Sequence, residues 1–172
     1  TYPSADLHFL TSHSHGAAPR LSATLHRVGY LTLPYHPYIM VSRGGSNQSV
    51  ANNSGTVIEF NQEHYDVGDH YNTSNYRFTA PVTGVYQVNV TVQYTGNINL
   101  VHAGLYKNGG NPGVNGTFDP WCNWGDDTRA AAFNHAIYLA ANDYIEAVTY
   151  QSTGSTQHLE QNRTKMTVYL LG

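Results

Sequence analysis

The chain has 172 residues, enough for one well-buried domain and a modest extra segment. Charged residues make up only 11% of the sequence, and the formal net charge of −3 argues against electrostatic binding of nucleic acid. The single cysteine, Cys122, excludes an intrachain disulfide, and no run of apolar residues is long enough to predict membrane insertion. Because the sequence begins at Thr1 and not at a methionine, we expect a fragment or a processed piece of a longer protein.

Residues 1–36 differ in composition from the rest of the chain and form the first predicted unit. They hold five of the ten histidines and three of the seven prolines, and they alternate only over short pieces such as LHF, RLSATLHRV and YLTLP. Strands this short cannot bury a core by themselves. We therefore predict a β-rich neck with a short hairpin, which either pairs with copies from neighbouring chains or belongs to a stalk.

Residues 37–172 alternate with the period of two that β-strands have. The pattern predicts half-buried strands with one wet face in the segments 86–93, 144–150 and 164–172. AAAFNHAIYLAA (130–141) has a helix-forming composition, yet its alternation favours a strand with two different faces. Gly-, Asn- and Pro-rich turns follow roughly every 8–12 residues, which predicts an all-β sandwich or jelly roll.

The stretch TAPVTGV (79–85) is predicted to separate two strands. Pro81 cannot donate a backbone hydrogen bond to a sheet, and Gly84 tolerates backbone conformations that other residues avoid. The chain is therefore expected to leave one strand before Pro81 and to enter another after it.

The segment FNQEHYDVGDHYNTSNYRFTAPVTGVYQVNV (60–90) resembles the complement-q/tumour-necrosis-factor jelly-roll family, in which an Asp- or Asn-rich turn precedes a Phe-Thr-Ala/Cys-Pro-x-x-Gly-x-Tyr stretch. AGLYKNGG (103–110) and LAANDYIEAVTYQSTG (139–154) are similar to two further family segments. For a head domain over residues 37–172, the resemblance implies a jelly-roll β-sandwich of about ten strands. It also implies a tight homotrimer that binds through exposed loops and catalyses no reaction. The matching residues of the main motif are Asp66, Tyr71, Phe78, Thr79, Pro81, Gly84 and Tyr86.

The first part of the chain, residues 6–41, resembles a linker of bacteriophage fibre and virion proteins, in which a hairpin ending in an Arg-Leu strand leads into a distal head. Arg20, Leu21, Gly29, Pro34 and Pro37 carry this resemblance. The two resemblances together imply the distal end of a trimeric phage fibre, located on the virion and outside the host cell. Its partners would be its own copies and a host-surface glycan or receptor.

His13 and His15 in TSHSHG (11–16) are the first metal candidates. Two residues apart in a strand, both rings project from one face, and three such pairs around a threefold axis supply six imidazole nitrogens. That set suits iron or another divalent transition metal, and trimeric phage fibre tips are known to carry His-x-His motifs of this kind. The alternative is a solvent-exposed hairpin turn.

Asp126 and Asp127 in WGDD (124–127) are the second metal candidates, because they fall where some members of the resembled family bind calcium. Carboxylates and loop carbonyls are the ligands that Ca²⁺ takes. In HYDVGDH (64–70), by contrast, we expect Asp66, Gly68 and Asp69 to form a turn that the side chains stabilise.

FDPWCNWG (118–125) places three aromatic residues, Phe118, Trp121 and Trp124, in one predicted loop. Aromatic faces stack on sugar rings, and Asn123 and Asp119 carry groups that hydrogen-bond sugar hydroxyls. The alternatives are a loop anchored to the core by its tryptophans and an interface between chains.

The sequence contains no catalytic set: the glutamates are scattered, and neither a GxSxG elbow nor a phosphate-binding Gly loop occurs. We therefore interpret the protein as a non-enzymatic head that recognises a host-surface glycan or protein through loops 107–127 and 151–163. One alternative is a cellular complement-like or cytokine-like trimeric module that binds proteins. The other is a capsule-degrading tail protein.

Overall fold

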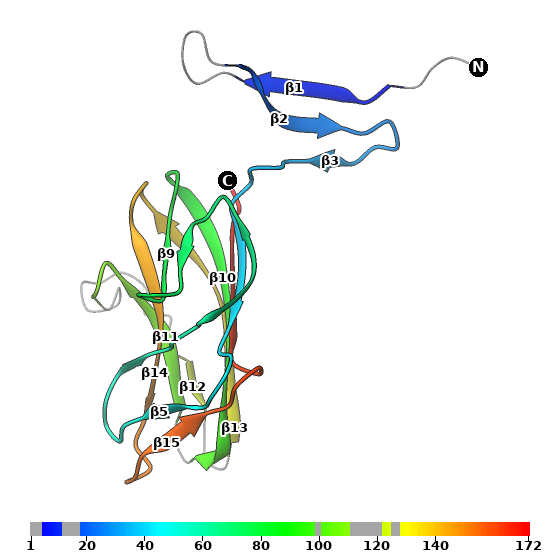
Figure 1. Ribbon diagram of the computed structural model, residues 1–172. Coiled ribbons are helices and arrows are strands. Elements are labelled where there is room, and N and C mark those ends of the chain that lie inside the picture. The colour runs from blue at the N-terminus through cyan, green and yellow to red at the C-terminus, as the bar shows by residue number, and fades with distance from the viewer. Residues whose placement is uncertain (1–4, 12–17, 99–100, 111–121, 125–127) are drawn as a thin grey trace. The chain divides into compact units, whose positions relative to one another are not determined.

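The computed structural model describes residues 5–11, 18–98, 101–110, 122–124 and 128–172 (Figure 1). Of residues 97, 122–124, 128 and 129 only the backbone is described. The chain divides into two compact units, Thr1–His36 and Pro37–Gly172, which we call the neck and the head. The regular elements of the described residues are all β-strands, so this part of the chain has no helix long enough to cross a membrane.

The neck is a three-stranded antiparallel sheet with the order β1-β2-β3. Its strands are β1 (Leu7–Thr11), β2 (Arg20–Leu25) and β3 (Leu31–Thr32). The pairing of β1 with β2 shifts register between Phe9 and Leu10. The turn from β2 to β3 contains Gly29 at φ 95°, a conformation that side chains other than glycine rarely adopt.

The head contains two sheets that face each other as the layers of a jelly-roll sandwich (Figure 1). The larger sheet has the order β5-β15-β10-β16-β4-β7, with β13 on β10, and every pair in it is antiparallel. Its strands are β4 (Tyr38–Ser42), β5 (Gln48–Val50), β7 (Gln62–Val67), β10 (Gly84–Ile98), β13 (Thr128–Leu139), β15 (Gln157–Leu159) and β16 (Lys165–Leu170).

The smaller sheet of the head has the order β12-β11-β14-β9-β8, with β6 also pairing with β14. Its strands are β6 (Thr56–Val57), β8 (Tyr71–Asn72), β9 (Arg77–Thr79), β11 (Val101–Lys107), β12 (Cys122–Trp124) and β14 (Tyr144–Gln151).

The core fills the space between the two sheets of the head. The alternating residues of β10 from Tyr86 to Tyr94 point into it, as the period of two predicted, and the ring of Phe78 meets that of Tyr86 edge-on at 5.5 Å. Each large apolar side chain buried in this way contributes about 1.5–3 kcal/mol to the free energy of unfolding. The hydroxyls of Tyr94 and Thr149 join the two layers at 2.8 Å, and burial raises the pKa of Tyr94 to about 12.

The three remaining strand predictions are confirmed, and for one of them, β14, the predicted solvent-exposed face is wrong. The helix-like segment 130–141 forms most of β13, and segment 164–172 contains β16. In β14, however, the face that includes Glu146 and Val148 is not exposed to solvent, because Val148 is fully buried and Glu146 is 7% exposed. Arg77 covers Glu146, with its Nε 3.0 Å from Glu146 Oε1.

The separation of two strands at TAPVTGV is confirmed, since β9 ends at Thr79 and β10 begins at Gly84. The reason predicted for Gly84 is wrong, because its φ is not positive. A Cβ atom there would instead lie 2.9 Å from the carbonyl oxygen of Gly172 and 2.7 Å from Leu170 Cδ1. Gly84 is therefore required by the close approach of the last residues of the chain.

Candidate functional site

Most of the predicted site residues lie outside the described residues. These are the metal candidates and three of the five glycan-contact candidates: His13, His15, Phe118, Asp119, Trp121, Asp126 and Asp127. The backbone of Asn123 and Trp124 forms part of β12, in which Trp124 lies opposite Val101 and Asn123 opposite His102. Among the residues that the structure does describe, no three metal-ligating side chains gather to hold an ion.

The two ends of the head differ in the segments that form them: one receives the chain from the neck, and the other is formed by turns. At one end, which we call the entry end, the neck joins the head at Pro37, and the Leu170 amide donates to the Pro37 carbonyl at 3.2 Å. Strand β10 begins beside this end and runs away from it to Ile98. The opposite end, which we call the distal end, therefore carries the turn that follows β5 and the turn between β14 and β15 (Figure 1).

The distal end is built from two turns, 51–55 and 152–156, that hydrogen-bond to each other. The Gly154 amide donates to Asn52 Oδ1 at 2.7 Å, and the Asn53 amide donates to the Gln151 carbonyl at 2.9 Å. The Tyr150 hydroxyl donates to Asn53 Oδ1 at 3.1 Å. These bonds fix the position of one turn against the other, so we call the pair the distal platform.

The buried side chain of Gln151 holds one turn of the distal platform in place. Its side chain is fully buried, and its Nε2 donates to the carbonyls of Val50 at 3.1 Å and Ser155 at 2.9 Å. Its Oε1 accepts from the amide of Thr153 at 2.9 Å and from the hydroxyl of the same residue at 2.7 Å. Because both donor and acceptor sites of one buried amide are used, the turn 152–156 has a defined conformation.

The chemistry of the distal platform is that of hydroxyls and amides. Its two turns read ANNSG and STGST, contain no charged residue and are largely exposed. Rigid groups that both donate and accept hydrogen bonds match the hydroxyls of a sugar or the peptide groups of a protein surface. The sequence prediction included 151–163 as a binding segment, but it missed 51–55, whose Asn-Asn-Ser-Gly sequence signals a turn without showing which turn it contacts.

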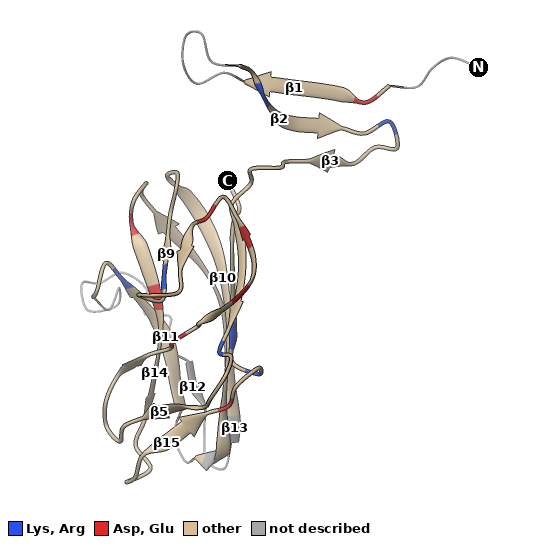
Figure 2. Ribbon diagram, viewed as in Figure 1, with Lys and Arg blue, Asp and Glu red and all other residues tan. Residues whose placement is uncertain are grey.

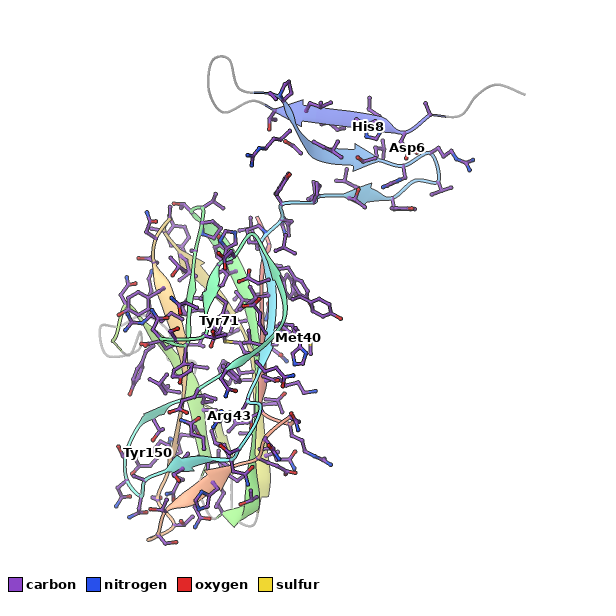
Figure 3. The ribbon with its side chains drawn as sticks, in the orientation of Figure 1. Asp6, His8, Met40, Arg43, Tyr71 and Tyr150 are labelled. Atoms are coloured by element: carbon purple, nitrogen blue, oxygen red, sulfur yellow. The ribbon has the colours of Figure 1, made fainter. Side chains whose placement is uncertain are left out.

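A separate hollow of about 550 Å³ lies near the entry end, and residues of β7, β8 and β9 line it together with Asp69, His70 and Pro81. The predicted turn beside it is present: Asp66 accepts the amide of His70 at 2.9 Å and that of Tyr71 at 2.7 Å. The Tyr71 side chain lies inside the head (Figure 3), where its hydroxyl donates to the carbonyl of Phe60 and burial raises its pKa.

The strands of the larger sheet contain few Lys, Arg, Asp or Glu residues (Figure 2). Strand β10 has no charged residue, and outward positions of β13 hold small or uncharged side chains from Ala132 to Tyr138. Tyr138 is 61% exposed, and Val85 opposite it is also exposed. Across β16, β4 and β7 the face continues as three tyrosine rings, with Tyr38 at 6.1 Å from Tyr65 and 6.4 Å from Tyr169.

Hydrogen bonds hold the polar side chains in the middle of this outer face. Asn89 Nδ2 donates to Thr167 Oγ1 at 2.9 Å, and Gln87 Nε2 donates to Asn89 Oδ1 at 3.1 Å. The face is therefore preorganised, largely uncharged and rich in Tyr, which is the composition of the centre of a protein–protein interface.

Comparison with known proteins agrees with this architecture. No curated protein sequence matches the chain. Among solved structures, the globular domain of zebrafish complement 1qA protein is similar with a TM-score of 0.59 and 12% identity, covering 80% of this chain and 98% of that one. The vertex protein P5 of PRD1 (TM-score 0.61, 14% identity) covers 80% and 99%, and murine APRIL (0.58, 14%) covers 79% and 99%. The model of the C1q domain matches residues 41–158, more than half of the sequence, so the chain belongs to the C1q domain family.

Proposed function

We propose that this chain is the distal head of a trimeric phage or viral fibre, which recognises a glycan or protein on the host surface without catalysing a reaction. The observation that carries the proposal is the distal platform, a rigid and uncharged hydrogen-bonding surface at the end of the head opposite Pro37. The similarity to PRD1 vertex protein P5 supports a place on a virion, because it shows that this fold occurs in a virion protein.

The homotrimer is proposed from the outer face of the larger sheet. This face has exposed Tyr138 and Val85, three neighbouring tyrosines and few charges. Covering it with a second protein removes apolar surface from water and therefore stabilises the assembly. Three heads on one axis present three distal platforms in the same direction. Weak single contacts then add up to a high avidity without any new chemistry.

The loop candidates of the sequence belong to the same proposal. Trp124 and Asn123 lie in β12, whose end at Trp124 pairs with Val101 at the start of β11. We propose that Phe118, Trp121 and Trp124 stack on sugar rings, while Asn123 and Asp119 hydrogen-bond hydroxyls. Metal binding by His13 and His15 on the trimer axis, and calcium binding by Asp126 and Asp127, remain proposals that elemental analysis of the purified protein tests.

The binding proposal is tested with the full chain on a glycan array and on intact candidate host cells. We expect wild-type binding to be lost in Trp121→Ala and Trp124→Ala variants that keep the assembly state of the wild type. A Tyr35→Ala variant, which removes an exposed aromatic ring between the neck sheet and the head, serves as the control for loop-specific loss. Unchanged binding by both tryptophan variants contradicts the aromatic site, and shortened polysaccharide chains after incubation contradict the non-enzymatic function.

A cellular function is the second candidate, because the family match and the structures of zebrafish complement 1qA and murine APRIL fit it equally well. In that case the partner of the distal platform is a protein in the extracellular space. Binding to the surface of candidate host cells favours the fibre head, and binding only to soluble extracellular proteins favours the cellular module.

A further inference from the structure

In the described residues the neck is a single sheet, and one of its two faces is apolar. Cross-strand pairing places Leu7, Leu25 and Leu31 in one row, and Phe9 follows Leu7 on the same face. We call these four residues the leucine face. Each of their side chains is between 43% and 55% exposed, although an apolar sheet face needs a second layer to be buried.

The opposite face of the neck sheet is polar, and its groups bond to each other. His8 Nδ1 lies 3.0 Å from Thr24 Oγ1, and His26 Nε2 lies 3.1 Å from Thr32 Oγ1. The other ring nitrogen of His26 lies 3.0 Å from a carboxylate oxygen of Asp6; Figure 3 labels Asp6 and His8 on this sheet. Thr24 is only 4% exposed. The neck therefore satisfies its polar side within one chain and leaves its apolar side open.

The head has a hydrophobic core of its own. Its cluster of buried core residues begins at Ile39, and no side chain of the neck belongs to that cluster in the described chain. The neck and the head are separate compact units. Neither the core of the head nor the described part of the neck contains a second layer for the leucine face.

We propose that the leucine face packs against the leucine faces of two other copies of this chain, so that three necks share one apolar core. This inference rests on the proposed homotrimer of the head. Only residues 33–36 separate β3 from the head, so assembly of three heads holds three necks at a high local concentration. The leucine face contains no charge, so identical copies meet without like-charge repulsion and without burying an unpaired ion.

The test compares the wild-type chain with Leu25→Glu by native mass spectrometry and by amide hydrogen exchange. The matched control is Val28→Glu, which adds the same charge at a turn residue that is 65% exposed and outside the leucine face. In the wild type and in the control we expect a trimer with slow exchange in β1 and β2. In Leu25→Glu we expect exchange in those strands to rise by about tenfold or more, while β10 stays protected.

The outcomes separate this inference from the proposed function. If all three proteins have the mass of one chain, the homotrimer fails and no other copy is available to cover the leucine face. If Leu25→Glu is a trimer with the exchange rates of the wild type, the shared neck core is wrong and the trimeric head stands. If only Leu25→Glu dissociates, or if only its neck strands lose protection, the shared core is supported.

Discussion

At the scale of single residues, Gly84 illustrates how a close approach of two backbones selects glycine. The Val85 amide donates to the carbonyl of Gly172 at 2.9 Å, and the Leu171 amide donates to the carbonyl of Val85 at 2.7 Å. The end of the chain is therefore hydrogen-bonded beside Gly84. The sequence predicted that glycine was needed there, but the residue that approaches it lies almost ninety positions away and leaves no local signal.

Gly84→Ala is predicted to lower the free energy of unfolding by about 1–3 kcal/mol, because the new methyl group meets a backbone carbonyl that is fixed by pairing. The measurement is chemical denaturation of the full chain. Gly96→Ala is the matched control, since nothing lies within 4 Å of a Cβ atom there. A Gly84→Ala variant as stable as Gly96→Ala contradicts the close approach.

Asp143 holds the turn between β13 and β14 through its charge. Its carboxylate lies 2.8 Å from Lys107 Nζ and accepts hydrogen bonds from Asn108 Nδ2 and the Ala140 amide, each at 2.8 Å. The hydrogen bond from Lys107, followed by that from Asn108, lowers the pKa of Asp143 from 3.8 to about 2. A carboxyl group whose pKa falls on folding stabilises the protein above its unfolded pKa and loses that effect as the pH falls.

Asp143→Asn is therefore predicted to cost about 1 kcal/mol at neutral pH, after allowance for solvent screening. The stability difference from the wild type should narrow as the pH falls from 4 toward 2. Urea unfolding at a series of pH values measures it, with Asp69→Asn as a control that removes a carboxylate from another turn. A difference that does not change between pH 6 and pH 2.5 contradicts the charged hydrogen bonds.

At the scale of elements, the turn 152–156 depends on the buried amide of Gln151. Gln151→Ala leaves the carbonyls of Val50 and Ser155 without their donor and is predicted to cost about 2–4 kcal/mol. Gln157→Ala is the control, because its amide bonds only to Thr153 and Ser155 side chains nearer the surface. Thermal unfolding of both variants measures the difference, and equal losses contradict the organising role of Gln151.

The strands themselves were predictable where polar and apolar residues alternate clearly. The burial of each strand's two faces was less predictable. The period of two identified β10, β13 and β16, because inward and outward residues differ in polarity along each of them. It failed for the second face of β14, where Glu146 is covered by Arg77 from a different strand. Burial of a charged residue by a distant partner depends on tertiary packing, which alternation along one strand does not encode.

The distal platform was predictable only in part for the same reason. Gly and Ser residues marked both turns, but the bond between Gly154 and Asn52 joins segments about a hundred residues apart. The aromatic and acidic candidates from Phe118 to Asp127 rest on residue type and resemblance, and apart from the backbone of residues 122–124 they lie outside the described residues. Their roles stay predictions.

At the scale of the whole molecule, the outer face of the larger sheet is the predicted contact between heads. Ala132→Arg places a positive charge beside Thr91 in the middle of this face. Burying it without a partner costs about 3 kcal/mol or more per chain, so the variant is predicted to dissociate. Thr73→Arg, in the exposed turn between β8 and β9, is the control and should keep the assembly of the wild type. Sedimentation velocity measures both, and an Ala132→Arg variant that sediments like the control contradicts the assignment of this face.

The mass of the purified chain in solution at about 1 μM tests the central claim most directly, because avidity, the shared neck core and the contact between heads all depend on three copies. Light scattering or native mass spectrometry is predicted to give about three times the 19.0 kDa of one chain. A stable, folded species with the mass of a single chain at that concentration would contradict the account.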